Sequence, residues 1–484
     1  MAAARAKTAA KAEATTNRVH AFGNDVLADH DAVALAELIR KGDLKSVEVT
    51  EAAIARARKV NGTLNAIEHE IFAHALLSAE SRKPTGVFGG VPTFVKDNAD
   101  MQGLPTRSGT RAATPHVAKK HGPFTEQYLA QGFTVLGKSS LPEFGFNAST
   151  EFEEDHPTRN PWNPEYSPGG SSGGSAALVA AGVVPIAHAN DGGGSIRVPA
   201  ACCGLIGLKP TRNRHRNNPS ASTMPINIVS EGVVTRSVRD TAAFMAGLEV
   251  FYRNPKLPEI GRVEGPGKKR LKIGLIVDSI TGTPTCDETR AVVNETAKLL
   301  ESLGHEIVPM PLPVPKSFLE DFTLYWAMLA FLLGTFGKFV IGPDFDPKKL
   351  DPFSKGLVDY YRKRMLKTPG MLYRLNQSEN LYKTAMRPYD AVLSPVLGHV
   401  VPKLGHLNPG QSFDELYERL MRYVAFTPLN NAAGSPAISL PMGVCANDLP
   451  IAVQFQAAHG NERTLLEIAY TLEAARPWRK IAAV

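Results

Sequence analysis

The chain has 484 residues, of which 43% are hydrophobic and 21% are charged, an ordinary composition for a globular protein. Its 54 basic and 47 acidic residues give a net charge of +7, and no dense basic stripe appears, so we expect no nucleic-acid partner. Four cysteines without a C-x-x-C pair argue against a disulfide scaffold, a redox pair and a metal site, and they fit a reducing, cytoplasmic compartment.

The N-terminal residues 1–27 are rich in alanine and basic residues, and we expect a disordered tail before a single domain at 28–484. At 31–42, apolar residues recur on one face of a helix. Asp31 is placed to cap its start and Gly42 to end it. A second helix is predicted from Ser46 to about residue 59, and the two should form a helical hairpin before the main sheet.

From residue 89 onward, short apolar runs alternate with helical patterns, which argues for an α/β sheet with parallel members. The apolar run at 176–187 contains Gly182 and Pro185 and is too short to cross a bilayer, so we expect no membrane partner. The segment 318–386 is predicted to form a mostly helical insert. The expected strands are 90–97, 133–139, 271–278, 305–310, 390–396 and 437–444, and the expected helices are 126–131 and 289–303, with a helix followed by a strand over 175–187.

The segment SPGGSSGGSAALVAAG, at 167–182, is the most unusual of the chain, because four glycines flank Ser171 and Ser172. Glycines this dense let the backbone approach a ligand or adopt positive φ. A phosphate-binding P-loop would need a lysine after the last glycine, and that lysine is absent. A flexible linker fits poorly, because strand and helix patterns adjoin both sides.

A second glycine cluster, HANDGGGSIRVPA at 188–200, follows a predicted strand and places Ser195 after Gly192, Gly193 and Gly194. Consecutive glycine amides can direct several N–H groups at one point, as an oxyanion hole requires. A serine at the end of such a run is well placed to attack a carbonyl group whose oxygen lies in that hole. The pattern therefore indicates a nucleophilic serine.

A nucleophilic serine needs a base. His188 and His156 have no obvious orienting carboxylate, and the G-x-S-x-G and S-x-x-K patterns are both absent. Lys96 remains, at the end of an apolar run where burial would disfavour its charge. A free lysine titrates near about 10.4, so the pKa must fall by about three for Lys96 to act as a base near neutrality. The alternative is a structural lysine paired with Asp97 or another acid.

Three segments together resemble the amidase signature family: GGVPTFVKDN at 89–98, the glycine/serine segment at 167–182 and DGGGSIRVPA at 191–200. The order of the segments and the 24-residue spacing from Ser171 to Ser195 match that family. Within it, PIAHANDGGGS and TRNPWN are most similar to the 6-aminohexanoate cyclic-dimer hydrolases, which degrade nylon oligomers. Further matching segments lie at 158–164, 207–212, 235–244 and 433–443, so the resemblance covers about 31–478.

The resemblance implies the amidase signature fold, a large mixed, mostly parallel β-sheet with helices on both faces. It also implies that Ser195 is the nucleophile, that Lys96 is the base, and that Ser171, after a cis peptide bond with Gly170, relays the proton between them. Ser172 is the adjacent residue that only the family spacing separates from the relay.

The same resemblance implies an oxyanion loop built from the backbone amides of Gly192, Gly193, Gly194 and Ser195. Asp191 and Arg197 look like scaffold residues that hold this loop. Gly192 stands where many relatives carry a side chain, which predicts a looser loop.

Four residues fall, by their order along the chain, where relatives line the acyl pocket: Phe146, Asn147, Trp326 and Asn430. Ordinary packing is the alternative for each. An aromatic pocket would favour an apolar or linear acyl chain over the polar side chain of glutamine. The aromatic helix expected at 318–330 either covers this pocket or belongs to the core.

These features predict a serine amidase that hydrolyses small or oligomeric amides without a metal or cofactor, as a monomer or homodimer. A rival interpretation is a glutamine amidotransferase subunit, a glutaminase working with a tRNA-binding partner; it would need a charged pair that the sequence does not locate. A non-catalytic binding protein on the same fold is disfavoured, because it would have no chemical reason to retain Lys96, Ser171 and Ser195.

Overall fold

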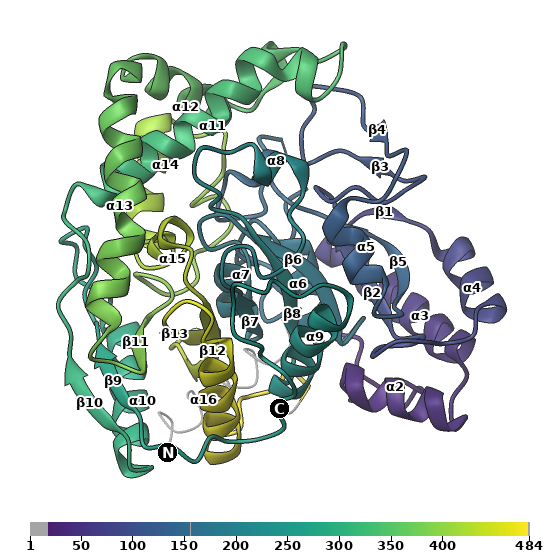
Figure 1. Cartoon of the computed structure of the whole chain (residues 1–484). Coiled ribbons are helices and arrows are strands. Elements are labelled where there is room, and N and C mark those ends of the chain that lie inside the picture. The colour runs from purple at the N-terminus through teal and green to yellow at the C-terminus, as the bar shows by residue number, and fades with distance from the viewer. Residues whose placement is uncertain (1–17, 155, 483–484) are drawn as a thin grey trace, which may run out of the picture.

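The structure is a computed structural model that describes residues 18–154 and 156–482. Its centre is an eight-stranded sheet, around which the helices are arranged (Figure 1). The strand order is β10 (Glu306–Pro309), β9 (Lys272–Leu275), β11 (Ala391–Pro395), β13 (Pro450–Gln456), β12 (Ala437–Val444), β7 (Ile206–Lys209), β8 (Ser230–Thr235) and β6 (Ile186–Asp191).

The sheet is mixed, as expected for the α/β class, but it is not mostly parallel. Within the described chain, only β10 with β9 and β9 with β11 pair in parallel, and the other five neighbouring pairs are antiparallel. The expected strand–helix–strand crossover occurs at β9, α10 (Asp287–Ser302) and β10. The strands β12 and β13 are joined by a short connection and form a hairpin, which can only be antiparallel.

A second, three-stranded sheet has the order β1 (Ile67–Glu70), β5 (Thr134–Ser139), β2 (Pro92–Lys96). It adjoins the edge of the large sheet, because β2 lies alongside β6. Thr93 Oγ1 donates to the carbonyl oxygen of Ile186 at 2.9 Å, and the Lys96 backbone N–H donates to His188 Nδ1 at 3.1 Å. A two-stranded ribbon, β3 (Pro105–Thr106) and β4 (His116–Val117), completes the strands of the described chain.

The predicted N-terminal helical hairpin is present as α2 (Ala32–Lys41) and α3 (Ser46–Leu64). Asp31 accepts a hydrogen bond from the Ala34 N–H, and Gly42 ends α2 with a φ of 83°. Both signals predicted from the sequence are therefore confirmed. The remaining helices of the main body are α4 (Phe72–Ser81), α5 (Pro123–Leu129), α6 (Gly173–Ala180), α7 (Arg197–Cys203), α8 (Pro219–Ser222), α9 (Val238–Phe251), α15 (Pro428–Ala433) and α16 (Glu462–Ala475).

The segment 318–386 is mostly helical and lies together with α14 (Phe413–Tyr423) at one end of the molecule, at the upper left in Figure 1. Its long helix α11 packs against both α12 and α13. These elements are α11 (Phe318–Val340), α12 (Pro352–Arg362) and α13 (Thr368–Met386), joined by the short 3₁₀ turns Pro347–Lys349 and Met365–Lys367.

The N-terminal side of the domain extends further than the sequence predicted. Residues 1–17 of the expected tail lie outside the described residues. Residues 18–27 instead pack on the domain: the Val19 N–H donates to the carbonyl oxygen of Pro161, the Ala21 N–H donates to that of Ala181, and Leu27 is buried.

Candidate active site

Lys96 is fully buried at the end of β2. Its Nζ lies 2.7 Å from Ser171 Oγ and 2.7 Å from Asn190 Oδ1. Burial lowers the pKa of Lys96 to about 7, although the negative charges of Glu231 and Asp191 oppose this shift. The alternative pairing with Asp97 is not formed, because the Asp97 carboxylate lies 3.2 Å from Lys138 Nζ. Lys96 is thus a buried amine that faces a serine rather than an acid.

Ser171 follows a cis peptide bond with Gly170, at the point where the glycine/serine segment meets β2 and β6. The neighbouring Ser172 points elsewhere: its Oγ donates to the carbonyl oxygen of Asn190 at 3.3 Å. Of the two adjacent serines, Ser171 is the one whose hydroxyl contacts Lys96. The geometry therefore separates two residues that the sequence left ambiguous.

The glycine loop after β6 carries Ser195, whose surface is 9% exposed. The Gly194 N–H donates to Asp191 Oδ1 at 2.7 Å. This amide was expected to bind an oxyanion, but it is already occupied. Within the described chain, no protein group accepts a hydrogen bond from the N–H of Gly192, Gly193 or Ser195. These three amides remain available to a substrate oxygen.

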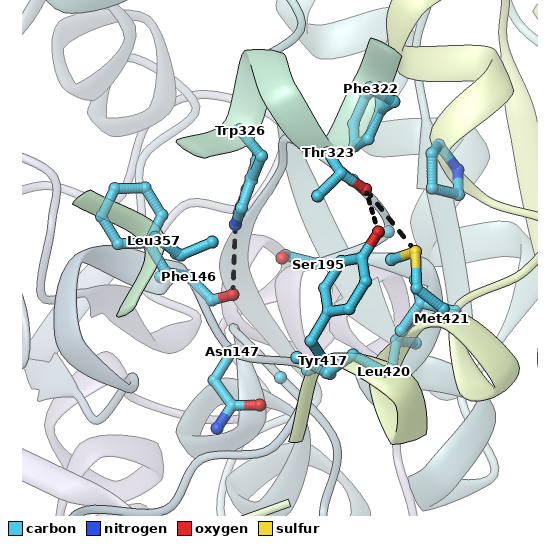
Figure 2. Close-up of a pocket in the computed structure, with 18 of the residues that line it drawn as sticks. Phe146, Asn147, Ser195, Phe322, Thr323, Trp326, Leu357, Tyr417, Leu420 and Met421 are labelled. Atoms are coloured by element: carbon cyan, nitrogen blue, oxygen red, sulfur yellow. Dashed lines mark hydrogen bonds between the residues drawn. The ribbon is translucent and has the colours of Figure 1, made fainter. Parts of the chain in front are cut away.

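A pocket opens beside Ser195 (Figure 2). Phe146, Asn147 and Trp326 lie in the wall of this pocket, with the rings of Phe146 and Trp326 in an edge-to-face contact at 5.4 Å. The Asn147 amide is used structurally, because its Nδ2 donates to the carbonyl oxygen of Leu407 at 2.7 Å. The wall contains no charged side chain among the described residues.

Much of the pocket wall comes from three helices, of which the sequence connected α11 with the pocket but not α12 or α14. Successive turns of α11 contribute Leu319, Phe322, Thr323 and Trp326, and α12 contributes Phe353 and Leu357. The helix α14 adds Tyr417, Leu420 and Met421. The amphipathic spacing of residues 413–423 is the signal that could have found this apolar face.

A family model for amidases matches residues 48–466. This chain belongs to the amidase signature family. AmiC of Mycobacterium leprae, whose name assigns it as an amidase, is 46% identical over 466 residues, which cover 96% of this chain and 99% of AmiC. The 6-aminohexanoate-cyclic-dimer hydrolase of Pseudomonas sp. (strain NK87) is 34% identical over 93% of this chain and 95% of that protein.

The amidase fold is also shown by solved structures. A 6-aminohexanoate cyclic dimer hydrolase complexed with substrate superposes with a TM-score of 0.84 at 30% identity, covering 94% of this chain and 98% of that one. The resemblance inferred from the three sequence segments is therefore confirmed. As a member of this family, the protein is an enzyme that hydrolyses amide carbon–nitrogen bonds other than peptide bonds.

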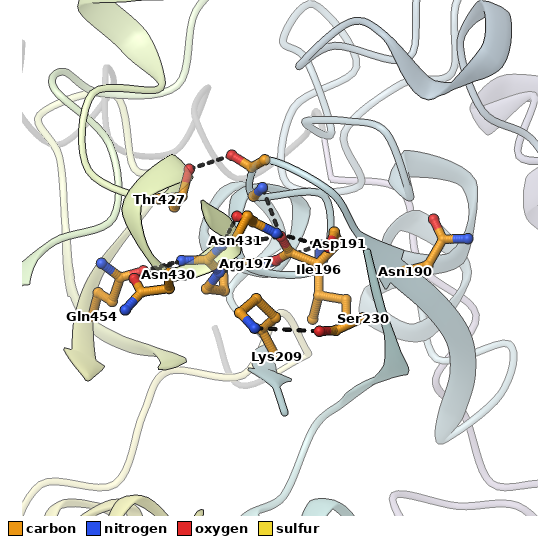
Figure 3. A network of polar contacts seen from close by, with 12 residues as sticks. Asn190, Asp191, Ile196, Arg197, Lys209, Ser230, Thr427, Asn430, Asn431 and Gln454 are labelled. Carbon is orange, nitrogen blue, oxygen red and sulfur yellow. Dashed lines mark hydrogen bonds and ion pairs between the residues drawn. The ribbon is translucent and has the colours of Figure 1, made fainter. Parts of the chain in front are cut away.

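In this amidase, a buried ion pair holds the glycine loop (Figure 3). Asp191 is bound by Arg197 through Nε at 2.9 Å and through Nη2 at 3.0 Å. Both side chains are fully buried, and the Arg197 charge holds the pKa of Asp191 far below its usual range in spite of that burial. Thr427 Oγ1 donates to the Gly193 carbonyl oxygen at 2.6 Å and fixes the outer side of the loop.

Asn430, which was expected to line the substrate pocket, does not lie in the wall of the pocket beside Ser195. Its side chain is fully buried, and its Oδ1 accepts a hydrogen bond from Arg197 at 3.2 Å. Asn431 and Gln454 bind the same guanidinium group, each at 2.7 Å. Asn430 lies on the side of the short helix α15 that faces the ion pair. The order of residues along the chain does not show which side of a helix a residue occupies. No local sequence signal identifies Asn431 or Gln454.

His188, which the sequence disfavoured as the base, binds the backbone of Lys96. His188 Nδ1 accepts the Lys96 backbone N–H, and its Nε2 lies 3.0 Å from a carboxylate oxygen of Glu231. With Nδ1 accepting, the proton must be on Nε2 and is donated to Glu231. Both ring nitrogens are therefore occupied, and His188 positions the end of β2.

Proposed function

We propose that this amidase cleaves small or oligomeric amides through an acyl-enzyme on Ser195, with Lys96 as base and Ser171 as proton relay. The observation that carries the proposal is the fully buried Lys96 amine 2.7 Å from the Ser171 hydroxyl, beside the pocket that Ser195 lines. A pKa of about 7 leaves a substantial fraction of Lys96 neutral near neutrality, so that its lone pair can accept a proton.

The proton moves along the serines in the first half of the reaction. Neutral Lys96 takes the hydroxyl proton of Ser171, which takes that of Ser195 as Ser195 Oγ attacks the amide carbon. In the described structure no hydrogen bond joins Ser171 to Ser195, so the Ser195 side chain must turn towards Ser171 when substrate binds. Such catalytic contacts often form only in the substrate complex.

The tetrahedral intermediate then collapses to an acyl-enzyme. Its oxyanion is bound by the free amides of Gly192, Gly193 and Ser195, and the proton returns through Ser171 to the leaving nitrogen as the carbon–nitrogen bond breaks. Water attacks the ester of Ser195, gives up a proton along the same route, and releases the carboxylic acid. The products are one amine and one acid, and the enzyme is unchanged.

The pocket supports an apolar acyl group. Its wall is aromatic and aliphatic, and the described residues that form it include no lysine, arginine, aspartate or glutamate to bind the amino and carboxyl groups of glutamine. The glutaminase alternative is therefore less supported. Two relatives named as hydrolases of a cyclic 6-aminohexanoate dimer support oligomeric amides of a linear aliphatic acid as a second substrate type.

Labelling with a small fluorophosphonate tests the nucleophile. We expect one adduct in the intact-protein mass of the wild type and of Ser172→Ala, and none in Ser195→Ala. Ser172→Ala is the matched control, because this buried hydroxyl contacts backbone instead of Lys96. An adduct that persists in Ser195→Ala, or a wild type that reacts no faster than free serine, would overturn the proposal.

Turnover of matched amides tests the substrate class. Anilides of hexanoic and benzoic acid, 6-aminohexanoate oligomers and glutamine should be compared at equal enzyme concentration. We expect kcat/KM for the apolar anilides to exceed that for glutamine by about a hundredfold or more, since each buried methylene contributes about 0.8 kcal/mol. Preference for glutamine would instead support the amidotransferase reading.

A further inference from the structure

Exposed apolar side chains concentrate on the helical segment that covers the pocket. Of the sixteen large hydrophobic residues that are exposed in the described chain, eight lie within residues 332–381, which is about a tenth of the sequence. Phe339 is 90% exposed and Leu366 is 94% exposed. Single exposed apolar residues are common, but such a concentration on one segment marks an interaction surface.

The helix α11 has two different surfaces. Its N-terminal half is built into the domain: Leu319, Phe322 and Trp326 line the pocket, and the buried Tyr325 donates its hydroxyl to the carbonyl oxygen of Ile226 at 2.6 Å. Its C-terminal half exposes Leu332, Phe336, Phe339 and Val340. By length and composition α11 could cross a bilayer, but the burial of its first half favours contact with a surface over insertion across it.

A second group of exposed apolar side chains lies beside the start of α11. Met365 and Leu366 are exposed on the turn between α12 and α13, and the adjacent Lys367 binds Glu320 of α11 at 2.7 Å. Phe339 lies nineteen residues along α11 from Glu320, or about 30 Å at the rise of an α-helix. The two points therefore lie near opposite ends of α11, at the end of the molecule that Figure 1 shows uppermost.

The charge around these apolar points is strongly positive. Residues 332–381 contain nine lysines and arginines against four aspartates and one glutamate, a net charge of +4. The basic side chains Lys338, Lys348, Lys349 and Lys363 are all exposed. Aromatic and aliphatic tips surrounded by lysine are the combination that binds an anionic bilayer, because the apolar tips enter the interface while the cations meet the headgroups.

We propose that the exposed side of α11 and the turn at 365–367 dock on the surface of a lipid bilayer that contains anionic lipid. This peripheral contact differs from the expectation of no membrane partner, which was based on the absence of a spanning segment. Docking in this way would place α11, which lines the pocket, at the lipid interface, where apolar amides accumulate. Because vesicle binding is measured without turnover, the inference does not rest on the proposed chemistry.

Flotation with vesicles tests the docking. We expect the full-length protein to float with vesicles of phosphatidylcholine and phosphatidylglycerol in equal parts, and to bind phosphatidylcholine vesicles about tenfold more weakly. The double variant Phe339→Ser/Leu366→Ser should lose about tenfold in partitioning, and Lys348→Glu/Lys349→Glu should lose a similar factor. Neither pair lines the pocket, so hydrolysis of a water-soluble anilide should be unchanged.

The matched control is Leu77→Ser/Val250→Ser, which removes two comparably exposed apolar side chains, 64% and 85% exposed, on α4 and α9. It should float like the wild type. The proposal is overturned if the wild type does not float, if the control loses as much binding, or if charge has no effect. It is also overturned if light scattering shows a dimer that Phe339→Ser/Leu366→Ser dissociates, because a second copy would then cover this surface.

Discussion

At the scale of single residues, the hydrogen bond from Lys96 to Asn190 orients the amine that we propose as the base. A neutral amine has two N–H groups and one lone pair. Lys96 donates one N–H to Asn190 Oδ1, and the lone pair can then face Ser171. The Asn190 amide is itself oriented, since its Nδ2 donates to Asn98 Oδ1 at 2.9 Å. An amide in this position orients the amine without adding a negative charge that would favour protonation.

This arrangement predicts the pH dependence of the enzyme. Because only neutral Lys96 accepts a proton and its pKa is about 7, kcat/KM should rise with pH through about 7. Asn190→Asp would place a carboxylate against the amine and raise its pKa, moving the rising limb upward by about one pH unit or more. Asn98→Asp, one contact further away, should move it less. Equal midpoints in wild type and Asn190→Asp would contradict this role.

The proposed catalytic set stands out in the sequence because its members are unusual at their positions. A lysine at the end of an apolar run and serines among dense glycines have few structural explanations. The residues that hold this set could not be predicted in the same way. Asn190, Thr427 and Gln454 are ordinary polar residues, and their contacts are made only when segments far apart in the chain fold together.

At the scale of elements, the glycine loop is held more tightly than its composition indicates. Asp191 accepts the N–H groups of Gly194 and Ile196, and Thr427 donates to the carbonyl group of Gly193. Gly194 has a φ of 133°, and a Cβ there would lie 2.4 Å from Thr427 Oγ1. At Gly192, the nearest atom to a Cβ would be on the Trp326 ring at 3.5 Å, an ordinary contact.

The two glycines should therefore respond differently to alanine. We expect Gly194→Ala to lower kcat/KM by about a hundredfold or more, because the displaced loop no longer directs its amides at the oxyanion. Gly192→Ala should stay within about threefold of wild type, since its methyl group has room. Steady-state kinetics with one anilide substrate, alongside the melting temperature of each variant, measures both. Equal losses in the two variants would contradict the geometry.

The sequence predicted the strands β2, β5, β6 and β9 to β12, but it did not predict β1, β3, β4, β7, β8 and β13, and it did not predict strand directions. The apolar runs at 390–396 and 437–444 correspond to β11 and β12. The strand β13 was missed, although the turn before it carries a signal: Asn447 and Asp448 follow β12, and Asp448 has a φ of 63°. Direction depends on which strands a connection can reach, and periodicity along a single strand does not contain that information.

At the scale of the whole molecule, one guanidinium group joins segments that span a little over half of the chain. Arg197 contacts Asp191 at the end of β6, Asn430 and Asn431 in α15, and Gln454 in β13. A buried ion pair of this kind is held by mutual attraction and by the hydrogen bonds of its neighbours. Removing one partner leaves the other charge buried without compensation.

Arg197→Met should therefore destabilise the protein by about 3–5 kcal/mol, measured as the free energy of unfolding in urea. Arg422→Met is a suitable control, because Arg422 is 57% exposed and binds Glu418 one helical turn away. Such surface pairs contribute about 0.5 kcal/mol or less. If both variants cost the same, the buried network would not have the structural role assigned to it.

The position of Gln454 also has a consequence for protein synthesis. Lys96 emerges from the ribosome early and Ser195 later, but the loop that carries Ser195 is braced by Arg197, whose guanidinium group is completed by Gln454 near the C-terminal end of the sequence. A nascent chain whose β13 is still inside the ribosome contains Lys96, Ser171 and Ser195, but it lacks the contact between Arg197 and Gln454. In the proposed mechanism, we therefore expect amide cleavage to begin only after β13 has folded, and chains that stop before β13 to be inactive.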